Sequence, residues 1–507
     1  MRSTNFFQLI LPVLFLSLIG CSAPVSTFYV DSQSGNDINP GTLNKPLKSI
    51  EKVNALQIQA GNSIYFAGGQ TFEGTLKFKG LTGTKAQPIV IGSYGKGRAT
   101  LNGGTGNGLL ADSCSWLQVK NLIVKGDGRL SGSTGSGIEF RRIQNSLIDS
   151  VEASGFLWSG VKAMGGQNLR ITNVFAHDNG FSGINVESDG QDAGGLEGSG
   201  GKTFRNLFIS NCVADNNPGC PSVKNNHSGN GILIGGVTKG MIEYCEAMNN
   251  GWDMPREGNG PVGIWAYQCD SVTIQYCYSH HNKTSPKGKD GGGFDFDGGM
   301  TNSILQYNLS ASNEGAGYGM FQYGGASLWQ NNIVRYNISY NDGSKNGKCG
   351  IFMWCDPAAI PMKQLHAFNN TIVSDQGYGV NFEPGNYPDF VFGNNLFLLT
   401  TASDRYAGGS FTGATFEQNL YWATLSVHPA LPTDSHGMSA DPQIVLPEAN
   451  SLTVKNIKEI NSIAYFQLSA TSPALKAGNP IENNGGKDYW QIQLSKIGKP
   501  NIGAFGK

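Results

Sequence analysis

The sequence predicts an all-β solenoid, and three observations support this: its glycine content, a repeated strand-like unit, and columns of identical residues. The chain has 507 residues and 71 glycines, about twice the usual share, whereas charged residues are only 14%. The repeated unit is a glycine followed by an apolar, a variable and an apolar residue, an alternation typical of half-buried strands. It begins at Gly137, Gly160, Gly183, Gly231, Gly263, Gly293, Gly319, Gly350 and Gly379. No helical pattern of similar strength is present.

Composition excludes several classes of protein. Lys plus Arg number 36 against 37 for Asp plus Glu, and a net charge of −1 disfavours nucleic-acid binding through a basic face. Hydrophobic residues make up 39%, so the chain is not intrinsically disordered. Glycine lacks the three-residue period of collagen. Length alone suggests about three domains of roughly 150 residues, but repeats at this spacing favour one stack of coils.

A second series of alternating segments carries fixed columns of residues. Coils that stack about 4.8 Å apart place equal positions in ladders, where Asn amides bond along the axis and small residues fit tight corners. The columns are Ala176, Ala214, Ala247, Ser279, Ser310 and Ser339; Asn179, Asn217, Asn250, Asn282 and Asn313; and Cys212, Cys245 and Cys277. We interpret the aligned cysteines as small core residues rather than disulfides or metal ligands.

The first 20 residues are predicted to be a targeting signal. The apolar run Phe6–Ile19 is shorter than the about 20 residues that span a membrane, and it suits the centre of a secretory signal. It ends in Leu-Ile-Gly-Cys at 18–21, which resembles the lipobox of bacterial lipoproteins. The resemblance implies lipidation of Cys21 and an exported lipoprotein of a bacterial cell envelope, on the periplasmic face or the outer membrane. The alternative is an ordinary signal peptide with a coincidental cysteine.

The repeats and both ends of the mature chain resemble one superfamily. The matching segments are Phe28–Asp31, Ser34–Asp37, Pro40–Thr42, Lys45–Ile50 and Ala60–Phe66 at the start, and Ser472–Ala474, Ala477–Gly478 and Pro500–Phe505 at the end. This pattern resembles the pectate-lyase-like superfamily and implies a right-handed, single-stranded parallel β-helix. We expect the β-helix over 21–414, with an N-terminal cap at about 28–100, and final coils with a C-terminal cap over 415–507. One fold hosts many chemistries, so the reaction must be argued from the site.

The strongest candidates for chemistry are Asp295 and Asp297. Two residues two positions apart in a strand project from the same face, about 6.5–7 Å apart. Glycoside hydrolysis needs one carboxylic acid to protonate the leaving oxygen and a second carboxylate as base or nucleophile. Like charges this close push the two pKa values apart, which supplies one acid and one base. The alternatives are a calcium site beside a turn and a solvated surface.

Neighbouring outward positions suggest a sugar-binding surface. Aromatic residues are expected on the rungs flanking the two acids, where ring faces suit the apolar faces of sugars: Trp265, Tyr267, Phe321, Tyr323, Phe352 and Trp354. Asn185 and Glu383 extend this face, and Glu187, at the start of a long loop, is a candidate third acid. Burial of the aromatics under a loop is the alternative interpretation.

Three functions compete. We favour a glycoside hydrolase acting on a polysaccharide or oligosaccharide as a monomer, with no required cofactor and no membrane contact beyond the lipid anchor. The chain lacks the Gly-His-Gly and Arg-Ile-Lys motifs of polygalacturonases, so that family's acids cannot be assigned here. The second candidate is a polysaccharide lyase assisted by Ca²⁺, with Lys162, Lys289 or Arg256 as base, although the face is poor in positive charge. The third is a non-catalytic glycan-binding surface protein.

Overall fold

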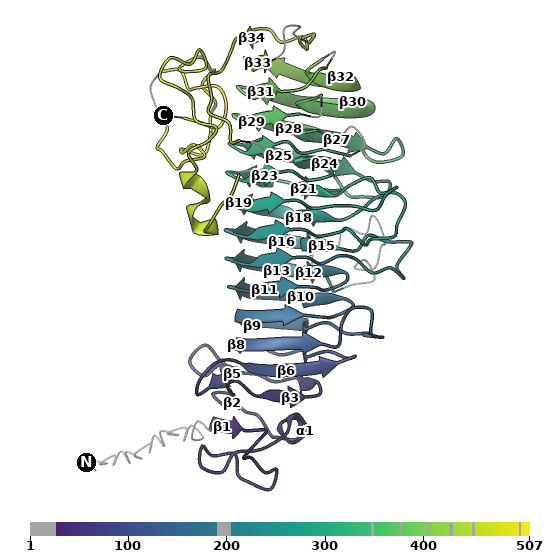
Figure 1. Ribbon diagram of the computed structural model, residues 1–507, viewed down its shortest axis with the longest axis vertical. Helices are drawn as coiled ribbons and strands as arrows, with labels where there is room; N and C mark the ends of the chain where they lie inside the picture. The colour runs from purple at the N-terminus through teal and green to yellow at the C-terminus, as the bar shows by residue number, and fades with distance from the viewer. Residues whose placement is uncertain are drawn as a thin grey trace, which may run out of the picture.

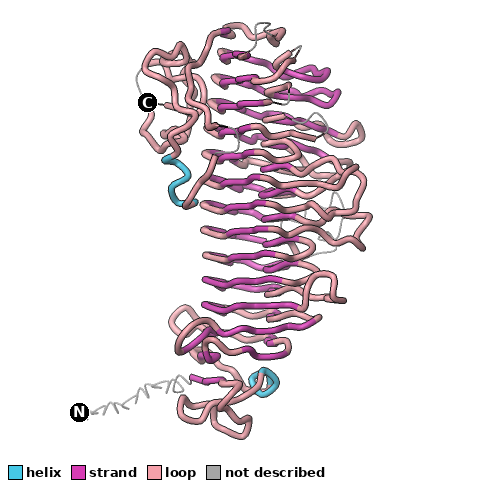
Figure 2. Tube along the Cα trace, in the orientation of Figure 1, coloured by secondary structure: helices cyan, strands magenta, loops and turns pink. Residues whose placement is uncertain are grey.

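Every strand of the computed structural model pairs in parallel with strands of the adjacent coils, so that the chain forms a parallel β-helix (Figures 1 and 2). The structure describes residues 27–189, 204–345, 349–375, 377–403, 405–424, 429–448, 452–495 and 498–506. The predicted signal peptide and the lipidation site at Cys21 lie outside these residues. Across the described ranges, no helix is long and apolar enough to cross a membrane.

The coils have three faces, which we call face 1, face 2 and face 3. Face 1 consists of β4 (Leu76–Lys79), β7 (Leu109–Asp112), β12 (Ser182–Glu187), β15 (Asn230–Gly235), β18 (Val262–Tyr267), β21 (Gly292–Phe296), β24 (Tyr318–Gln322) and β27 (Ile351–Cys355). Five longer strands bend from one face into another: β8 (Leu117–Gly126), β9 (Ile138–Ser154), β10 (Ser159–Thr172), β30 (Val380–Gly393) and β32 (Ala407–Glu417).

The other two faces complete each coil. Face 2 consists of β1 (Thr27–Val30), β2 (Ser63–Ala67), β5 (Ile89–Tyr94), β13 (Phe204–Ser210), β16 (Val237–Glu243), β19 (Asp270–Gln275), β22 (Ile304–Gln306), β25 (Gln330–Arg335) and β28 (Lys363–Phe368). Face 3 consists of β3 (Thr71–Glu73), β6 (Ala99–Gly104), β11 (Phe175–His177), β14 (Val213–Asp215), β17 (Glu246–Met248), β20 (Tyr278–His280), β23 (Leu309–Ala311), β26 (Ile338–Tyr340), β29 (Thr371–Ser374), β31 (Leu396–Leu399), β33 (Leu420–Ala423) and β34 (Met438–Ser439). The helices are α1 (Ile50–Asn54) and the 3₁₀ helix η1 (Ile457–Ser462).

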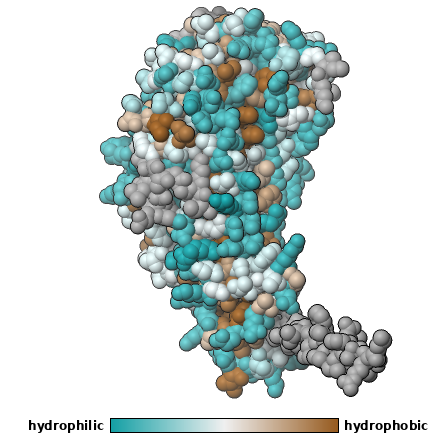
Figure 3. Space-filling view, turned by 180° about the vertical axis from the view of Figure 1, so that it is seen from behind, coloured by the Kyte–Doolittle hydropathy of each residue, from teal (hydrophilic) through white to brown (hydrophobic). Residues whose placement is uncertain are grey.

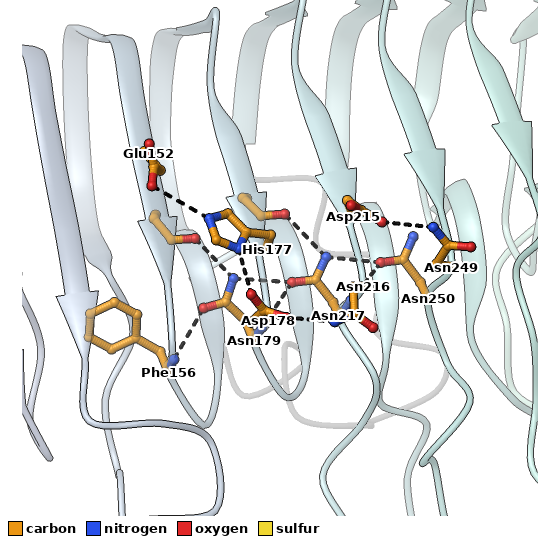
Figure 4. Close-up of polar contacts among 12 residues, drawn as sticks. Glu152, Phe156, His177, Asp178, Asn179, Asp215, Asn216, Asn217, Asn249 and Asn250 are labelled. Carbon is orange, nitrogen blue, oxygen red and sulfur yellow. Dashed lines mark hydrogen bonds and ion pairs between the residues drawn. The ribbon is translucent and has the colours of Figure 1, made fainter.

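The predicted asparagine ladder is confirmed, and it fills a turn between faces 3 and 1 (Figure 4). The side-chain amide of Asn217 donates to Asn250 Oδ1 at 2.9 Å, and the Asn217 main-chain N–H donates to the same oxygen at 3.0 Å. Each buried Asn therefore satisfies two donors of the preceding coil. The ladder runs through Asn282 and Asn313 and ends at the buried carboxylate of Asp342, which accepts from Asn313 Nδ2 at 2.7 Å.

The cysteine column is confirmed as part of the core. Cys212, Cys245 and Cys277 are buried, and the sulfur of Cys277 accepts from the main-chain N–H of Cys245. In the next coil Asn308 takes this position and accepts from the N–H of Cys277 at 3.0 Å. The column then continues as a second Asn ladder through Asn337, Asn370, Asn395 and Asn419 to Asp434.

The C-terminal segment differs from the prediction of a cap over the last coil. The described residues between 440 and 506 run back along the side of the stack, as the yellow trace in Figure 1 shows. Asn369 Nδ2 donates to the carbonyls of Asn501 and Gly503, and the N–H of Ala504 donates to Thr371 Oγ1 at 2.9 Å. Apolar residues of the segment pack on outward residues of face 3, such as Leu396 and Ile338. These outward positions are apolar, so the segment must cover them laterally.

Candidate active site

Two outward rows of residues run along face 1. The first row, aligned by strand register, is Glu139, Lys162, Asn185, Leu233, Trp265, Asp295, Gly319, Phe352 and Asn381. The second row lies two residues further along each strand and contains Glu187, Gly235 and Tyr267, then Asp297, and then Phe321 and Trp354. The predicted alignment of outward residues from coil to coil is correct except in one coil. Asp295 pairs with Gly319, whereas the sequence pattern had placed Phe321 beside it. The glycine that opens this coil is Gly317.

Three carboxylates lie on β21 or directly beside its two ends. Asp295 is 3% exposed and Asp297, just after the strand, is half-buried. Asp290, which the sequence analysis did not single out, lines a hollow of about 10 Å³ together with Asp295. A hollow of this volume holds about one water molecule. The acid pair is thus on one face as predicted, but the buried member lies in a small hollow rather than an open cleft.

Hydrogen bonds fix the two half-buried acids to the backbone. Asp290 Oδ2 accepts from the main-chain N–H of Gly260 at 2.6 Å, which joins the loops before β18 and β21. Asp297 Oδ1 accepts from the N–H of Gly298 at 2.7 Å, and the N–H of Asp297 itself donates to the Ala266 carbonyl at 2.9 Å. The three carboxylates therefore have positions set by strand pairing and loop contacts.

Glu187 forms a second polar cluster with Tyr267 and Asn185. The Tyr267 hydroxyl donates to Glu187 Oε1 at 2.7 Å across an intervening coil, and Asn185 Nδ2 donates to Oε2 at 3.1 Å. Burial raises the pKa of Glu187 and, together with the Glu187 charge, holds the pKa of Tyr267 well above its usual value. Gly235 lies between them, and a Cβ there would be 2.4 Å from the Tyr267 ring. The absence of a side chain at Gly235 lets the phenol reach Glu187.

Glu187 does not join the acids of β21. Three coils separate it from Asp297 in the second row, which corresponds to about 14 Å at 4.8 Å per coil. Carboxyl pairs that flank one glycosidic bond lie about 5–9.5 Å apart. This separation is too large for Glu187 to act on the same glycosidic bond as Asp295 and Asp297, so the prediction that it is a third acid at that bond is wrong. The cluster around Glu187 contains one buried acceptor without a hydrogen bond: Asn185 is 2% exposed, and its Oδ1 has no partner within the described ranges.

The aromatic residues that were predicted to form a sugar-binding surface are largely buried. Trp265, Phe321 and Phe352 are buried, which corrects the expectation that they present open ring faces. Trp265 packs with Phe181, Leu233 and loop residues, whereas Phe321 and Phe352 contact edge to face at 5.8 Å. The half-buried rings are those of Tyr267, Tyr323 and Trp354. These three remain the rings best placed to meet a ligand.

A histidine that the sequence analysis missed lies against Trp265. His227, from the loop before β15, contacts the Trp265 ring edge to face at 5.0 Å, and its Nδ1 lies 3.1 Å from Asn230 Nδ2. Asn230 Oδ1 in turn accepts from Trp265 Nε1 at 3.1 Å. Burial, and then the charge of Arg256, lowers the pKa of His227 to about 4, so the ring is neutral at neutral pH. A loop residue outside the repeat gave no sequence signal for this contact.

The remaining candidates lie further from the acids or at the surface. Lys162 places its ammonium 5.7 Å from the Trp158 ring centre, and Lys289 and Glu383 are exposed. Hydrophilic residues cover most of the side seen in Figure 3, with hydrophobic residues in separate patches. No group of three or more His, Cys, Asp or Glu side chains in the described part of the chain is arranged to hold a metal ion.

Comparison with known proteins identifies the fold. The family described as "Right handed beta helix region" matches residues 190–420. Pectate lyase L of Paenibacillus polymyxa is 24% identical over 443 residues, which cover 85% of this chain and 79% of that protein. Lacto-N-biosidase of Bifidobacterium longum is also 24% identical, over 94% of this chain but 36% of its own length. The chain thus spans about a third of that relative.

A solved structure agrees with this assignment. The GH136 lacto-N-biosidase from Eubacterium ramulus superposes with a TM-score of 0.52 at 17% identity, covering 77% of this chain and 67% of that chain. At this identity the likeness shows a shared fold. The reaction therefore has to be inferred from the side chains on face 1.

Proposed function

We propose that this chain, a right-handed parallel β-helix protein of the pectate-lyase-like superfamily, is a carbohydrate-active enzyme that hydrolyses glycosidic bonds. The observation that carries the proposal is the gathering of Asp290, Asp295 and Asp297 on one segment of face 1, with two of them lining one hollow. A named relative that is a lacto-N-biosidase supports an activity on glycans.

The surroundings of the three aspartates suggest which one acts as the general acid and which as the base or nucleophile. Burial favours the uncharged form of a carboxyl group, so the buried Asp295 is suited to protonate the leaving oxygen. Asp297 is half-buried and reaches water, which suits a base or nucleophile. Asp290 borders the same hollow as Asp295 and is the alternative second carboxylate. Tyr267, Tyr323 and Trp354 are the rings we expect to contact sugar.

A lyase acting on a uronate polymer is the second candidate, favoured by the relative named pectate lyase L. That reaction needs a base such as Lys162, Lys289 or Arg256, and Ca²⁺ as an electrophile. Two loop cations are engaged in ion pairs, Lys287 with Glu257 at 2.8 Å and Lys345 with Glu314 at 3.5 Å. This pairing reduces the positive charge offered to a uronate and favours hydrolysis of a less acidic glycan.

The test measures both reactions at once. The purified protein is incubated with neutral and uronic polysaccharides and with neutral oligosaccharides, with and without EDTA, while reducing ends and absorbance near 235 nm are recorded. We expect reducing ends without the ultraviolet signal, insensitive to EDTA, and lost in Asp295→Asn and in at least one of Asp290→Asn and Asp297→Asn. Asp215→Asn, a carboxylate on face 3, is the matched control. Ultraviolet absorbance that EDTA abolishes would instead establish the lyase.

We also propose that the mature protein is anchored in the bacterial cell envelope through a lipid on Cys21. Metabolic labelling with a palmitate analogue tests this, because Cys21→Ala removes the only acceptor that the lipobox-like motif provides. Release of the unlabelled wild-type protein into the soluble fraction would refute it.

A further inference from the structure

An open groove of about 480 Å³ lies across face 2, on a different side of the coils from the candidate active site. It crosses the neighbouring strands β10, β13, β16 and β19. Its volume is within the range of about 300–1,000 Å³ of small-molecule sites. The lining combines two cations with apolar and polar side chains, among them Arg170, Lys239, Phe208, Met241, Asn206 and Ser271.

A glycine contributes to the hollow. Gly240 takes the inward position that Leu207 holds in the coil before it and Val272 in the coil after it. A Cβ at Gly240 would lie 3.1 Å from Val272 and 3.3 Å from Val237, closer than ordinary van der Waals contact. The main chain of this coil therefore lies closer to the core than a larger residue would allow, and the outer surface is hollowed there.

Arg170 and Lys239 bring two positive charges to the groove. Both are exposed, and among the described residues neither has an ion-pair partner. The guanidinium of Arg170 lies over the Phe208 ring, 4.1 Å from its centre, a contact that orients it without using its N–H donors. The two cations come from strands two coils apart, which corresponds to about 9.6 Å along the axis.

The acids of the adjoining strands are bonded to their own neighbours. Glu243 Oε2 accepts from Gln275 Nε2 at 2.9 Å, and Asp270 Oδ1 accepts from Thr301 Oγ1 at 2.6 Å. Neither carboxylate lines the groove. The described lining thus contains two cations and no acid, so the groove attracts an anion.

Lys239 occupies a turn position that asparagine holds in the three preceding coils. Asn206 Nδ2 donates to Asn168 Oδ1 at 2.8 Å, and Asn168 Nδ2 donates to Asn145 Oδ1 at 2.8 Å. All four residues have a left-handed φ, which asparagine adopts more readily than lysine, and the φ of Lys239 is 62°. Lys239 ends this ladder at a cost in backbone strain, and no described residue donates to the exposed Asn206 Oδ1. The fold alone would be served better by a further asparagine.

We infer that this groove is a second binding site, specific for an acidic oligosaccharide that it holds by the carboxylates of uronate units. The planar guanidinium of Arg170 matches one carboxylate, and Lys239 meets a second one further along the ligand. Met241 offers apolar surface to the C–H face of a sugar, while the exposed Asn206 and Ser271 face its hydroxyls. The inference concerns binding on face 2 alone, so it does not rest on the proposed function.

Calorimetric titration of the full chain with a galacturonate trimer at low salt tests the groove, and a galactose trimer is the matched ligand without carboxylates. We expect the galacturonate trimer to bind with a Kd of about 1 mM or below. The galactose trimer and the galacturonate monomer should bind at least about tenfold more weakly, because the first lacks both charges and the second is too short to meet both cations. Salt at about 0.5 M should weaken binding of the charged trimer, since the cations are exposed.

Variants locate the binding. Lys239→Asn and Arg170→Gln should each weaken binding of the galacturonate trimer about tenfold, and Lys239→Asn restores the residue of the preceding coils, so its stability in urea should equal or exceed that of the wild type. Lys363→Asn, four coils further along the same face, is the matched control and should leave the affinity unchanged. Asp295→Asn should bind the trimer as the wild type does, which separates the groove from face 1.

Two outcomes would overturn the inference. One is equal affinity for the charged and neutral trimers, or an affinity that Lys239→Asn and Arg170→Gln leave unchanged. The other is binding to phosphatidylglycerol vesicles that both variants abolish, without binding of the trimer, which would assign the groove to lipid headgroups.

Discussion

Replacement of Asp342 by Asn should stabilise the protein at neutral pH. Asp342 ends the first asparagine ladder and is almost fully buried, and burial raises its pKa from an ordinary 3.8 to about 6. Its oxygens accept from the N–H and Nδ2 of Asn313 and from Ser339 Oγ. An Asn there keeps one acceptor oxygen, and its amide can donate to Ser339 Oγ and, following the pattern of Asn313, to a carbonyl of an earlier coil.

The magnitude and sign follow from linkage. A folded-state pKa above the unfolded value means that the wild type loses stability as pH rises from about 4 to about 6, and the loss is complete above that range. At about 1.36 kcal/mol per pKa unit, the rise from 3.8 to about 6 amounts to about 3 kcal/mol. Asp342→Asn should therefore be about 3 kcal/mol more stable than the wild type at pH 8, and less than about 1 kcal/mol different at pH 4.

Urea unfolding followed by tryptophan fluorescence at both pH values measures the difference. Asp434→Asn is the matched control, because Asp434 ends the second ladder in a half-buried position. An equal gain at pH 4 and pH 8, or a loss at pH 8, would show that the buried carboxylate is not the source of the penalty.

Three more variants test contacts on face 1 and in the ladders. Tyr267→Phe removes a hydrogen-bond donor to the buried Glu187 and should lower the free energy of unfolding by about 1.5–3 kcal/mol at pH 8. The decrease should be smaller at acid pH, where Glu187 is protonated, and a decrease that does not depend on pH would contradict this reasoning. Gly235→Ala places a Cβ 2.4 Å from the Tyr267 ring and should cost about 1–3 kcal/mol in urea unfolding, whereas Tyr267→Phe/Gly235→Ala should be less than additive. Asn250→Ala leaves two donors of Asn217 without an acceptor and should cost about 2–5 kcal/mol, while the exposed Asn249→Gly should change stability by about 0.5 kcal/mol or less.

The inward half of the structure could be predicted because stacking repeats it. Each Asn of the first ladder must satisfy donors of the coil before it, so the same residue recurs at a fixed place in successive coils and is visible in the sequence. The cysteines share a column for the same reason, since a small buried residue is required at that corner. The periodicity of the sequence was therefore sufficient to predict the fold class and these columns of core residues.

The outward half could be predicted only in part, because packing there does not repeat. Asp295 and Asp297 share a face as strand alternation requires, but the loops that bring Asp290 and His227 to this face have no periodic pattern. The coil containing Gly319 was aligned two residues off, because Gly317 and Gly319 are both followed by residues that fit the repeated pattern. The C-terminal segment also lacks the repeat, so its lateral position had no signal in the sequence.

Two glycines show how a repeating scaffold acquires different surroundings for its carboxylates. Glu187 pairs in register with Gly235, and Asp295 pairs with Gly319. At Gly235 the empty side-chain position is filled by Tyr267 from the next coil, which donates to Glu187. At Gly319 it is bordered by the Phe321 ring of the same strand, and a Cβ there would lie 2.7 Å from that ring and 3.2 Å from Asp295 Oδ1. One carboxylate thus accepts a hydrogen bond from a phenol, whereas the other has an aromatic ring beside it. A missing side chain beside each acid is what allows two outward positions of one sheet to differ chemically.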